Sequence, residues 1–281
     1  MDPVESMPPK IKQMNTKEER RTERQKIGKL TEQQVSQSTK GRYQEALKDL
    51  ESFTKIPLSE LLHSSGVDEV LASYVEMLWE DGEPKVKANY TLAGIQFHRP
   101  SLKGQLRQSW RLLSLWNKLE EPRRATPLSP SLLLSFAGVL LQWQWSRLAC
   151  LCTVGYAGLL RTGEMFLLQR QHVILPRTPD QSAVLFLVNT KTTQRNLLQS
   201  EKVLIKEKIA IESLRYLCAG LRKEDFLVTT SAAKFRSVWK DVVQHLGLQD
   251  FNYLPYSIRR GAATAAYNEG ATFDELLERG R

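Results

Sequence analysis

The amino-acid sequence predicts a mainly helical protein with one small antiparallel β-sheet, an α+β fold. Three observations predict it. Apolar residues recur at helical spacing through most of the chain. Three short apolar segments lie close together between residues 172 and 206. A proline-rich segment separates a wholly helical first part from this mixed second part. Hydrophobic residues make up 41% of the 281 residues, so each part has enough apolar material for a core.

The first part begins with a polar, charge-dense arm over residues 1–34, which has no apolar periodicity. We expect this basic arm to be disordered or loosely helical. A helical domain over residues 35–120 follows, with an apolar face in each helix. Its four helices are predicted within residues 35–53, 64–83, 85–100 and 101–122.

The fourth of these helices carries a basic ridge. Lys103, Arg107 and Arg111 recur every four residues, on a different side from the apolar residues. Such a ridge is either a solvated helix face or a surface that binds DNA phosphates. The surplus of positive charge, +9 for the whole chain, is compatible with the second interpretation.

Residues 121–130, EPRRATPLSP, contain three prolines and two arginines and predict a linker. The second domain, residues 131–281, is predicted to begin with a long buried helix from Ser131 to Leu151. Strands are expected in HVILP, AVLFLVNTK and EKVLIK, which would form the sheet. Helices are then expected within residues 209–221, 231–248, 256–270 and 272–280.

Composition narrows the possible functions. The three cysteines lie in apolar runs and read as buried thiols of an intracellular protein, nuclear if the host is a eukaryote. The four histidines have no metal-site spacing, so no metal is expected. The N-terminus lacks a secretory signal, and the longest apolar stretch is interrupted by polar residues, so no membrane span is expected. No glycine-rich phosphate loop is present, so no nucleotide or other cofactor is predicted.

Three short motifs in the second domain carry residues suited to chemistry: GLLRTGE at 158–164, VNTKTTQRN at 188–196 and YSIRRGAATAA at 256–266. Each has an ordinary interpretation when taken alone. The first fits an arginine paired with a glutamate at a helix N-terminus. The second fits a polar residue at the tip of a β-hairpin, and the third fits arginines on a helix surface.

In this order and spacing, the motifs resemble those of the tyrosine recombinase family, the phage-integrase and Xer-like enzymes that exchange DNA strands. The resemblance covers roughly residues 35–281, and it is weak in the first domain. It implies that Arg161 and Arg259 are the catalytic arginines and that Lys191 is the hairpin lysine. Glu164 would be a supporting acidic residue, and Tyr256 stands where the family usually has histidine.

The resemblance also implies a recombinase-like catalytic domain and a reaction. A tyrosine hydroxyl attacks a DNA phosphodiester, giving a 3′-phosphotyrosyl link, while two guanidinium groups stabilise the charge on the phosphate. Neither metal nor cofactor is needed. The family pattern places the nucleophilic tyrosine past Arg281, so no nucleophile is assigned and the sequence reads as a truncated, inactive form. Arg260 has no fixed role in the pattern; we expect it to contact DNA phosphate or to pack.

Three functions therefore stay open. The protein is a recombinase or integrase of a mobile element, a recombinase-derived module that binds DNA without cutting it, or a basic helical interaction protein. Under the first two, the partner is double-stranded DNA, and a homo-oligomer forms on paired sites. The first two also require that Arg161, Lys191 and Arg259 meet around one phosphate.

Overall fold

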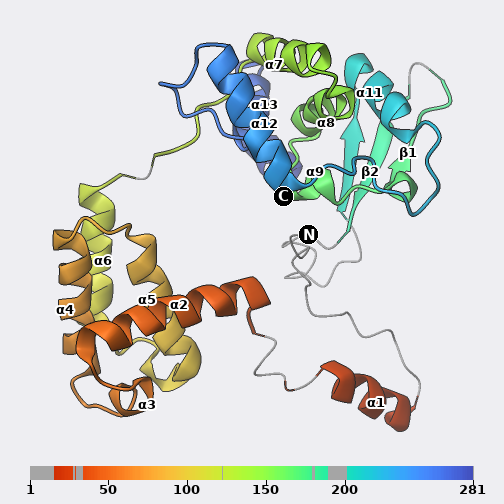
Figure 1. Ribbon diagram of the computed structural model, residues 1–281. Helices are drawn as coiled ribbons and strands as arrows, with labels where there is room; N and C mark the ends of the chain where they lie inside the picture. Colours follow the sequence, from red (N-terminus) through yellow and green to blue (C-terminus); the bar gives the residue numbers. More distant parts are fainter. Residues whose placement is uncertain are drawn as a thin grey trace. The chain divides into compact units, whose positions relative to one another are not determined.

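The computed structural model describes residues 16–27, 29, 34–121, 123–178, 181–188 and 201–280. They divide into two compact units, Met1–Pro122 and Arg123–Arg281, each with its own hydrophobic core (Figure 1). In the predicted arm, residues Lys17–Ile27 form helix α1, whose side chains are largely exposed. Acidic residues in its first turn and basic residues in its last turn suit the helix dipole.

The first unit is an all-helical bundle, as the sequence predicts. Its elements are α2 (Gln37–Thr54), α3 (Leu58–Leu61), α4 (Val67–Glu80), α5 (Val86–His98), the short 3₁₀ helix η2 (Pro100–Leu102) and α6 (Arg107–Leu119). Leu50, Leu71, Leu92 and Leu113 are almost fully buried between the helices. Helices α2 and α5 pack closely because Gly94 has no side chain; a Cβ there would lie 3.2 Å from Leu47 Cδ1.

The start of α6 differs from the prediction, because a contact from α4 fixes it. Asp68 accepts hydrogen bonds from the main-chain N–H groups of Gln108 and Ser109 at 2.9 and 3.1 Å, as an N-cap residue would. Burial would raise the pKa of Asp68, but the hydrogen bonds from Ser109 and Gln108 outweigh it and lower that pKa. The helix therefore begins at Arg107, and Lys103 lies in the preceding turn.

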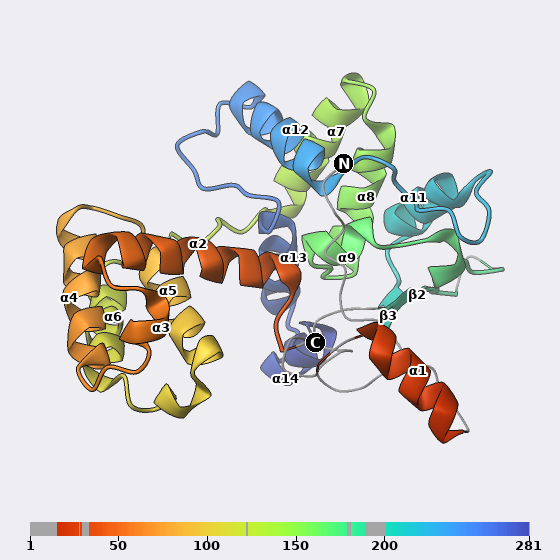
Figure 2. The same ribbon diagram turned by 60° about the horizontal axis from the view of Figure 1, so that its bottom comes forward.

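The second unit is mainly helical and contains one small sheet (Figures 1 and 2). Strands β1 (Val173–Ile174), β2 (Ala183–Leu187) and β3 (Glu201–Ile205) are antiparallel in the order β1-β2-β3, with Val173 opposite Leu185 and Ala183 opposite Ile205. The α+β class is thereby confirmed. The helices are α7 (Pro130–Gln142), α8 (Ser146–Ala157), α9 (Thr162–Phe166), the 3₁₀ helix η3 (Arg170–His172), α11 (Lys208–Cys218), α12 (Ala232–His245), α13 (Ser257–Asn268) and α14 (Phe273–Gly280).

The single long helix predicted from Ser131 to Leu151 is wrong. Helix α7 ends at Gln142 and α8 begins at Ser146, with Gln144 in the left-handed region at φ 63°. The break lets α8 fold back and pack against α7, α11 and α13. Because α8 is surrounded on several sides, it is apolar around almost its whole circumference. That pattern hides a helix end from sequence analysis.

Candidate functional site: two adjacent arginines

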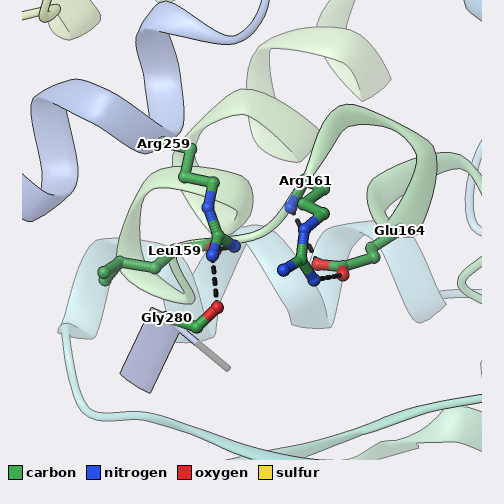
Figure 3. Close-up of polar contacts among 5 residues, drawn as sticks. All are labelled: Leu159, Arg161, Glu164, Arg259 and Gly280. Carbon is green, nitrogen blue, oxygen red and sulfur yellow. Dashed lines mark hydrogen bonds and ion pairs between the residues drawn. The ribbon is translucent and has the colours of Figure 1, made fainter. Parts of the chain in front are cut away.

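Arg161 is held at the N-terminus of α9 by Glu164. The main-chain N–H of Arg161 donates to Glu164 Oε2 at 2.8 Å, and the Arg161 guanidinium donates to Oε1 at 2.6 Å. The Glu164 side chain is only 5% exposed, whereas that of Arg161 is 36% exposed. The buried carboxylate therefore orients the guanidinium (Figure 3), while part of the Arg161 side chain stays open to solvent.

Arg259 reaches the same place from α13. Its guanidinium donates one hydrogen bond to the main-chain carbonyl of Leu159 and another to that of Gly280 (Figure 3). Leu159 lies in the turn before Arg161 and adopts a positive φ of 49°, an unusual conformation for a branched residue. This turn thus supplies both Arg161 and an oxygen that holds Arg259.

The two guanidinium groups are neighbours. Burial lowers the pKa of Arg259, and the charge of Arg161 lowers it further, while Glu164 and Tyr256 act in the opposite direction. Figure 3 shows the two side chains next to each other. Glu164 is ion-paired with Arg161, whereas the main-chain carbonyls of Leu159 and Gly280 satisfy N–H groups of Arg259 without cancelling its charge. An anion with several oxygens, such as a phosphate, would relieve the repulsion between the two guanidinium groups and accept hydrogen bonds from both.

The other predicted catalytic residues fall in different places. Tyr256 directly precedes α13, is 50% exposed, and lies close enough to Arg259 to affect its pKa. Lys191 lies outside the described residues. The structure therefore brings Arg161, Glu164, Tyr256 and Arg259 together and says nothing of the lysine.

Arg260 makes a contact inside the second unit. Its guanidinium donates to the main-chain carbonyl of Ala125, in the segment that we call the strap, residues 123–128. This is the packing contact that the sequence offered as one alternative, while the contact with DNA phosphate stays a prediction. Adjacent arginines on one helix turn thus have separate tasks, since Arg259 faces Arg161 and Arg260 ties down the strap.

The basic ridge of the first unit is also altered. Arg107 and Arg111 lie one turn apart on α6 and are exposed. Lys103 is exposed as well, but it belongs to the turn before the helix, so the three residues do not form one helical row as predicted. The sequence analysis missed the capping carboxylate of Asp68, which comes from a distant segment.

His172 was also missed by the sequence analysis. It lies in η3 and lines a small cavity together with Glu164 and Phe186. Its Nδ1 accepts a hydrogen bond from the main-chain N–H of Gln169 at 3.1 Å, which requires an unprotonated Nδ1. Burial lowers the pKa of His172. A hydrogen bond to the main chain of Leu167 raises this pKa, but the effect of burial is larger.

We expect the second unit to lose stability as the pH falls from 7 to 5, and part of this loss to disappear in His172→Asn. The folded pKa of His172 lies below its unfolded value of 6.5, so the unfolded chain binds the proton more readily. The stabilising effect of the neutral ring is present above pH 6.5 and fades as the pH falls through the folded pKa. Asparagine keeps an acceptor but cannot titrate in this range.

Amide hydrogen exchange across η3 and β1 at pH 7, 6 and 5, corrected for the intrinsic pH dependence of exchange, measures this effect. The exposed His245, on α12, provides the control substitution His245→Asn. Identical pH dependence in wild type and His172→Asn would contradict the prediction.

In the part of the chain that the structure describes, no group of three or more His, Cys, Asp or Glu side chains is placed to hold a metal ion. No described helix has the length and apolar character that crossing a bilayer requires.

The fold is similar to that of solved DNA integrases. One is the Tn1549 transposon integrase in complex with circular intermediate DNA, with a TM-score of 0.63 and 11% sequence identity; the match covers 88% of this chain and 86% of that one. A variant of that integrase in complex with transposon right end DNA gives a TM-score of 0.64 and 12% identity over the same shares. Neither a protein-family model nor a curated protein matches the sequence. At such low identity, the similarity establishes the fold.

Proposed function

We propose that this protein binds double-stranded DNA as a member of the tyrosine recombinase class, with Arg161 and Arg259 contacting one phosphodiester. The observation that carries the proposal is the meeting of these two guanidinium groups, from segments far apart in sequence, on an integrase-like fold. Two planar, permanently charged forks suit a phosphate better than they suit any neutral ligand. The net charge of +9 is of the sign that DNA binding needs.

The chemistry would be cleavage and rejoining of DNA strands, as in site-specific recombination or integration, through a 3′-phosphotyrosyl intermediate. Arg161 and Arg259 would stabilise the charge that develops on the non-bridging oxygens, and Glu164 would keep Arg161 in position. Tyr256 would donate a hydrogen bond to the phosphate, and Lys191 would protonate the leaving 5′-oxygen. The reaction also needs a nucleophilic tyrosine, which we assign to no residue of this sequence. Assembly on paired DNA sites would make the protein oligomeric during the reaction.

A second candidate is a recombinase-derived module that binds DNA without cutting it. Tyr256 favours this alternative, because a phenol is a poorer general base at neutral pH than the imidazole that the family usually has here. The contacts of Arg259 favour it too, since two of its N–H groups already donate to main-chain carbonyls.

Fluorescence anisotropy with a labelled duplex at increasing salt tests DNA binding. We expect log affinity to fall linearly with log salt, and Arg161→Gln and Arg259→Gln to weaken binding more than Arg222→Gln, which removes an arginine that is 89% exposed beyond α11. No affinity at low salt would leave only a basic helical interaction protein.

A pool of nicked duplexes of randomised sequence then separates the two candidates. A protein–DNA adduct that survives detergent, and that is lost in Arg259→Gln, would support the recombinase. Salt-sensitive binding without an adduct would support the binding module.

A further inference from the structure

The strap, residues 123–128, is attached to the loop and helix that carry Arg259. The main-chain N–H of Thr126 donates to the carbonyl of Asn252 at 2.9 Å, and that of Leu128 donates to the carbonyl of Ser257 at 3.1 Å. The side-chain amide of Asn252 donates to the carbonyl of Arg124 at 3.1 Å and lies 3.4 Å from that of Arg123. A segment with the composition of a flexible linker is therefore fixed at almost every residue.

Packing reinforces these hydrogen bonds. Ala125 and Leu128 are buried, and Arg260 binds the carbonyl of Ala125. Gly261 touches the main chain of Leu128 so closely that a Cβ would lie 1.8 Å from its carbonyl oxygen. The strap and the first turns of α13 thus behave as one piece of structure.

Two side chains of the strap remain outside this packing. Arg123 and Arg124 are both exposed, while the carbonyls of the same two residues are bound to Asn252. Their main chain is fixed relative to the turn that carries Tyr256 and Arg259. Neither arginine has a role in the reaction chemistry proposed above.

We propose that Arg123 and Arg124 form a second phosphate-binding element, which holds the DNA backbone next to the phosphate bound by Arg161 and Arg259. This proposal rests on the proposed function. The element contacts backbone phosphates, so it contributes affinity and register but no sequence preference. Because the main chain is already fixed, binding costs less conformational entropy than it would for arginines on a free linker.

Salt dependence provides the test, with the full-length chain and a labelled duplex. The variant Arg123→Gln/Arg124→Gln removes two charges at exposed positions, and the control Arg222→Gln/Lys223→Gln removes two exposed charges past the end of α11. If each strap arginine neutralises one phosphate, the slope of log affinity against log salt should become shallower by roughly 1.8. We expect at least about a tenfold loss of affinity for the strap pair at moderate salt and less than about a twofold loss for the control.

A third variant, Asn252→Ala, keeps every charge and releases the carbonyls of Arg123 and Arg124. If preorganisation matters, this variant loses part of the affinity that the double strap variant loses, with circular dichroism showing an intact fold. Equal losses for the strap pair and the control pair would overturn the proposal, because net charge alone would then explain binding. If Arg161→Gln weakens DNA binding but the strap substitutions do not, this inference is overturned while the proposed function stands.

Discussion

Gly261→Ala is expected to destabilise the second unit by about 2 kcal/mol or more, in the upper part of the roughly 1–3 kcal/mol that overpacking a core costs. The new Cβ would lie 1.8 Å from the carbonyl oxygen of Leu128 and 2.6 Å from its carbonyl carbon and amide nitrogen. These are main-chain atoms held by a hydrogen bond to Ser257, so no side chain can rotate out of the way. The strap must leave α13, or α13 must shift.

Gly138→Ala is the matched control in the same unit. Gly138 lies inside α7, and a Cβ built on it meets nothing within 4 Å. Alanine should therefore stabilise this helix by about 0.4–1 kcal/mol, because it restricts the unfolded chain and favours helix. Denaturant unfolding of the two variants measures both effects. If both variants changed the free energy of unfolding slightly and in the same direction, the prediction would be wrong, and the strap could move to accommodate a Cβ at position 261.

Gly261→Ala also separates stability from binding. If the strap detaches while the rest of the unit stays folded, the loss of DNA affinity should resemble that of Asn252→Ala and stay smaller than that of Arg123→Gln/Arg124→Gln, because both arginine charges remain. A variant that unfolds altogether would instead lose all affinity together with its circular dichroism signal.

Local sequence patterns predicted most of the elements. The apolar spacing of α2 predicted a helix, and its cap is local as well, because Ser36 accepts a hydrogen bond from the main-chain N–H of Thr39. The strands were predictable because each is a short apolar segment, such as AVLFL in β2, next to polar turn residues. In each case the signal that predicts the element lies within a few residues along the chain.

The failures arise where distant segments decide the outcome. Helix α6 begins at Arg107 because Asp68, on another helix, caps it. The chain turns at Gln144 within an apolar run that sequence analysis reads as continuous helix. Arg260 packs on Ala125, 135 residues away, and nothing near Arg260 in the sequence indicates this partner.

The candidate site divides in the same way. The pairing of Arg161 with Glu164 spans three residues and was predictable from the motif alone. The contact of Arg259 with Leu159 spans 100 residues, and only the spacing of motifs in a known family placed the two arginines together. The contact with Gly280 was not predicted, because a main-chain carbonyl leaves no mark on the sequence.

The pair of Arg161 and Glu164 leads to the second large expected effect. Arg161→Met should lower the stability of the second unit by about 2–3 kcal/mol, because it removes the guanidinium that is ion-paired with the buried Glu164 carboxylate. The value lies below that of a fully buried pair because Arg161 is 36% exposed and Glu164 still accepts the N–H of residue 161. Denaturant unfolding of Arg161→Met, Glu164→Gln and the double variant completes a thermodynamic cycle. We expect a coupling energy of about 1–2 kcal/mol between the two side chains. The double variant should lose less unfolding free energy than the two single variants lose together.

The DNA affinity of Glu164→Gln then shows whether Glu164 acts mainly by positioning Arg161 or mainly through its negative charge. This variant removes a negative charge from the arginine pair, so counting charges predicts tighter binding to a duplex. If the carboxylate holds the Arg161 fork in place, binding should weaken instead, because the amide cannot form the same charge-assisted hydrogen bond to the guanidinium. We expect weaker binding, and we expect Glu212→Gln, which removes an exposed glutamate paired with Arg215 on α11, to leave affinity unchanged or slightly raised. Tighter binding by Glu164→Gln would mean that the Arg161 guanidinium reaches the phosphate without help from its partner.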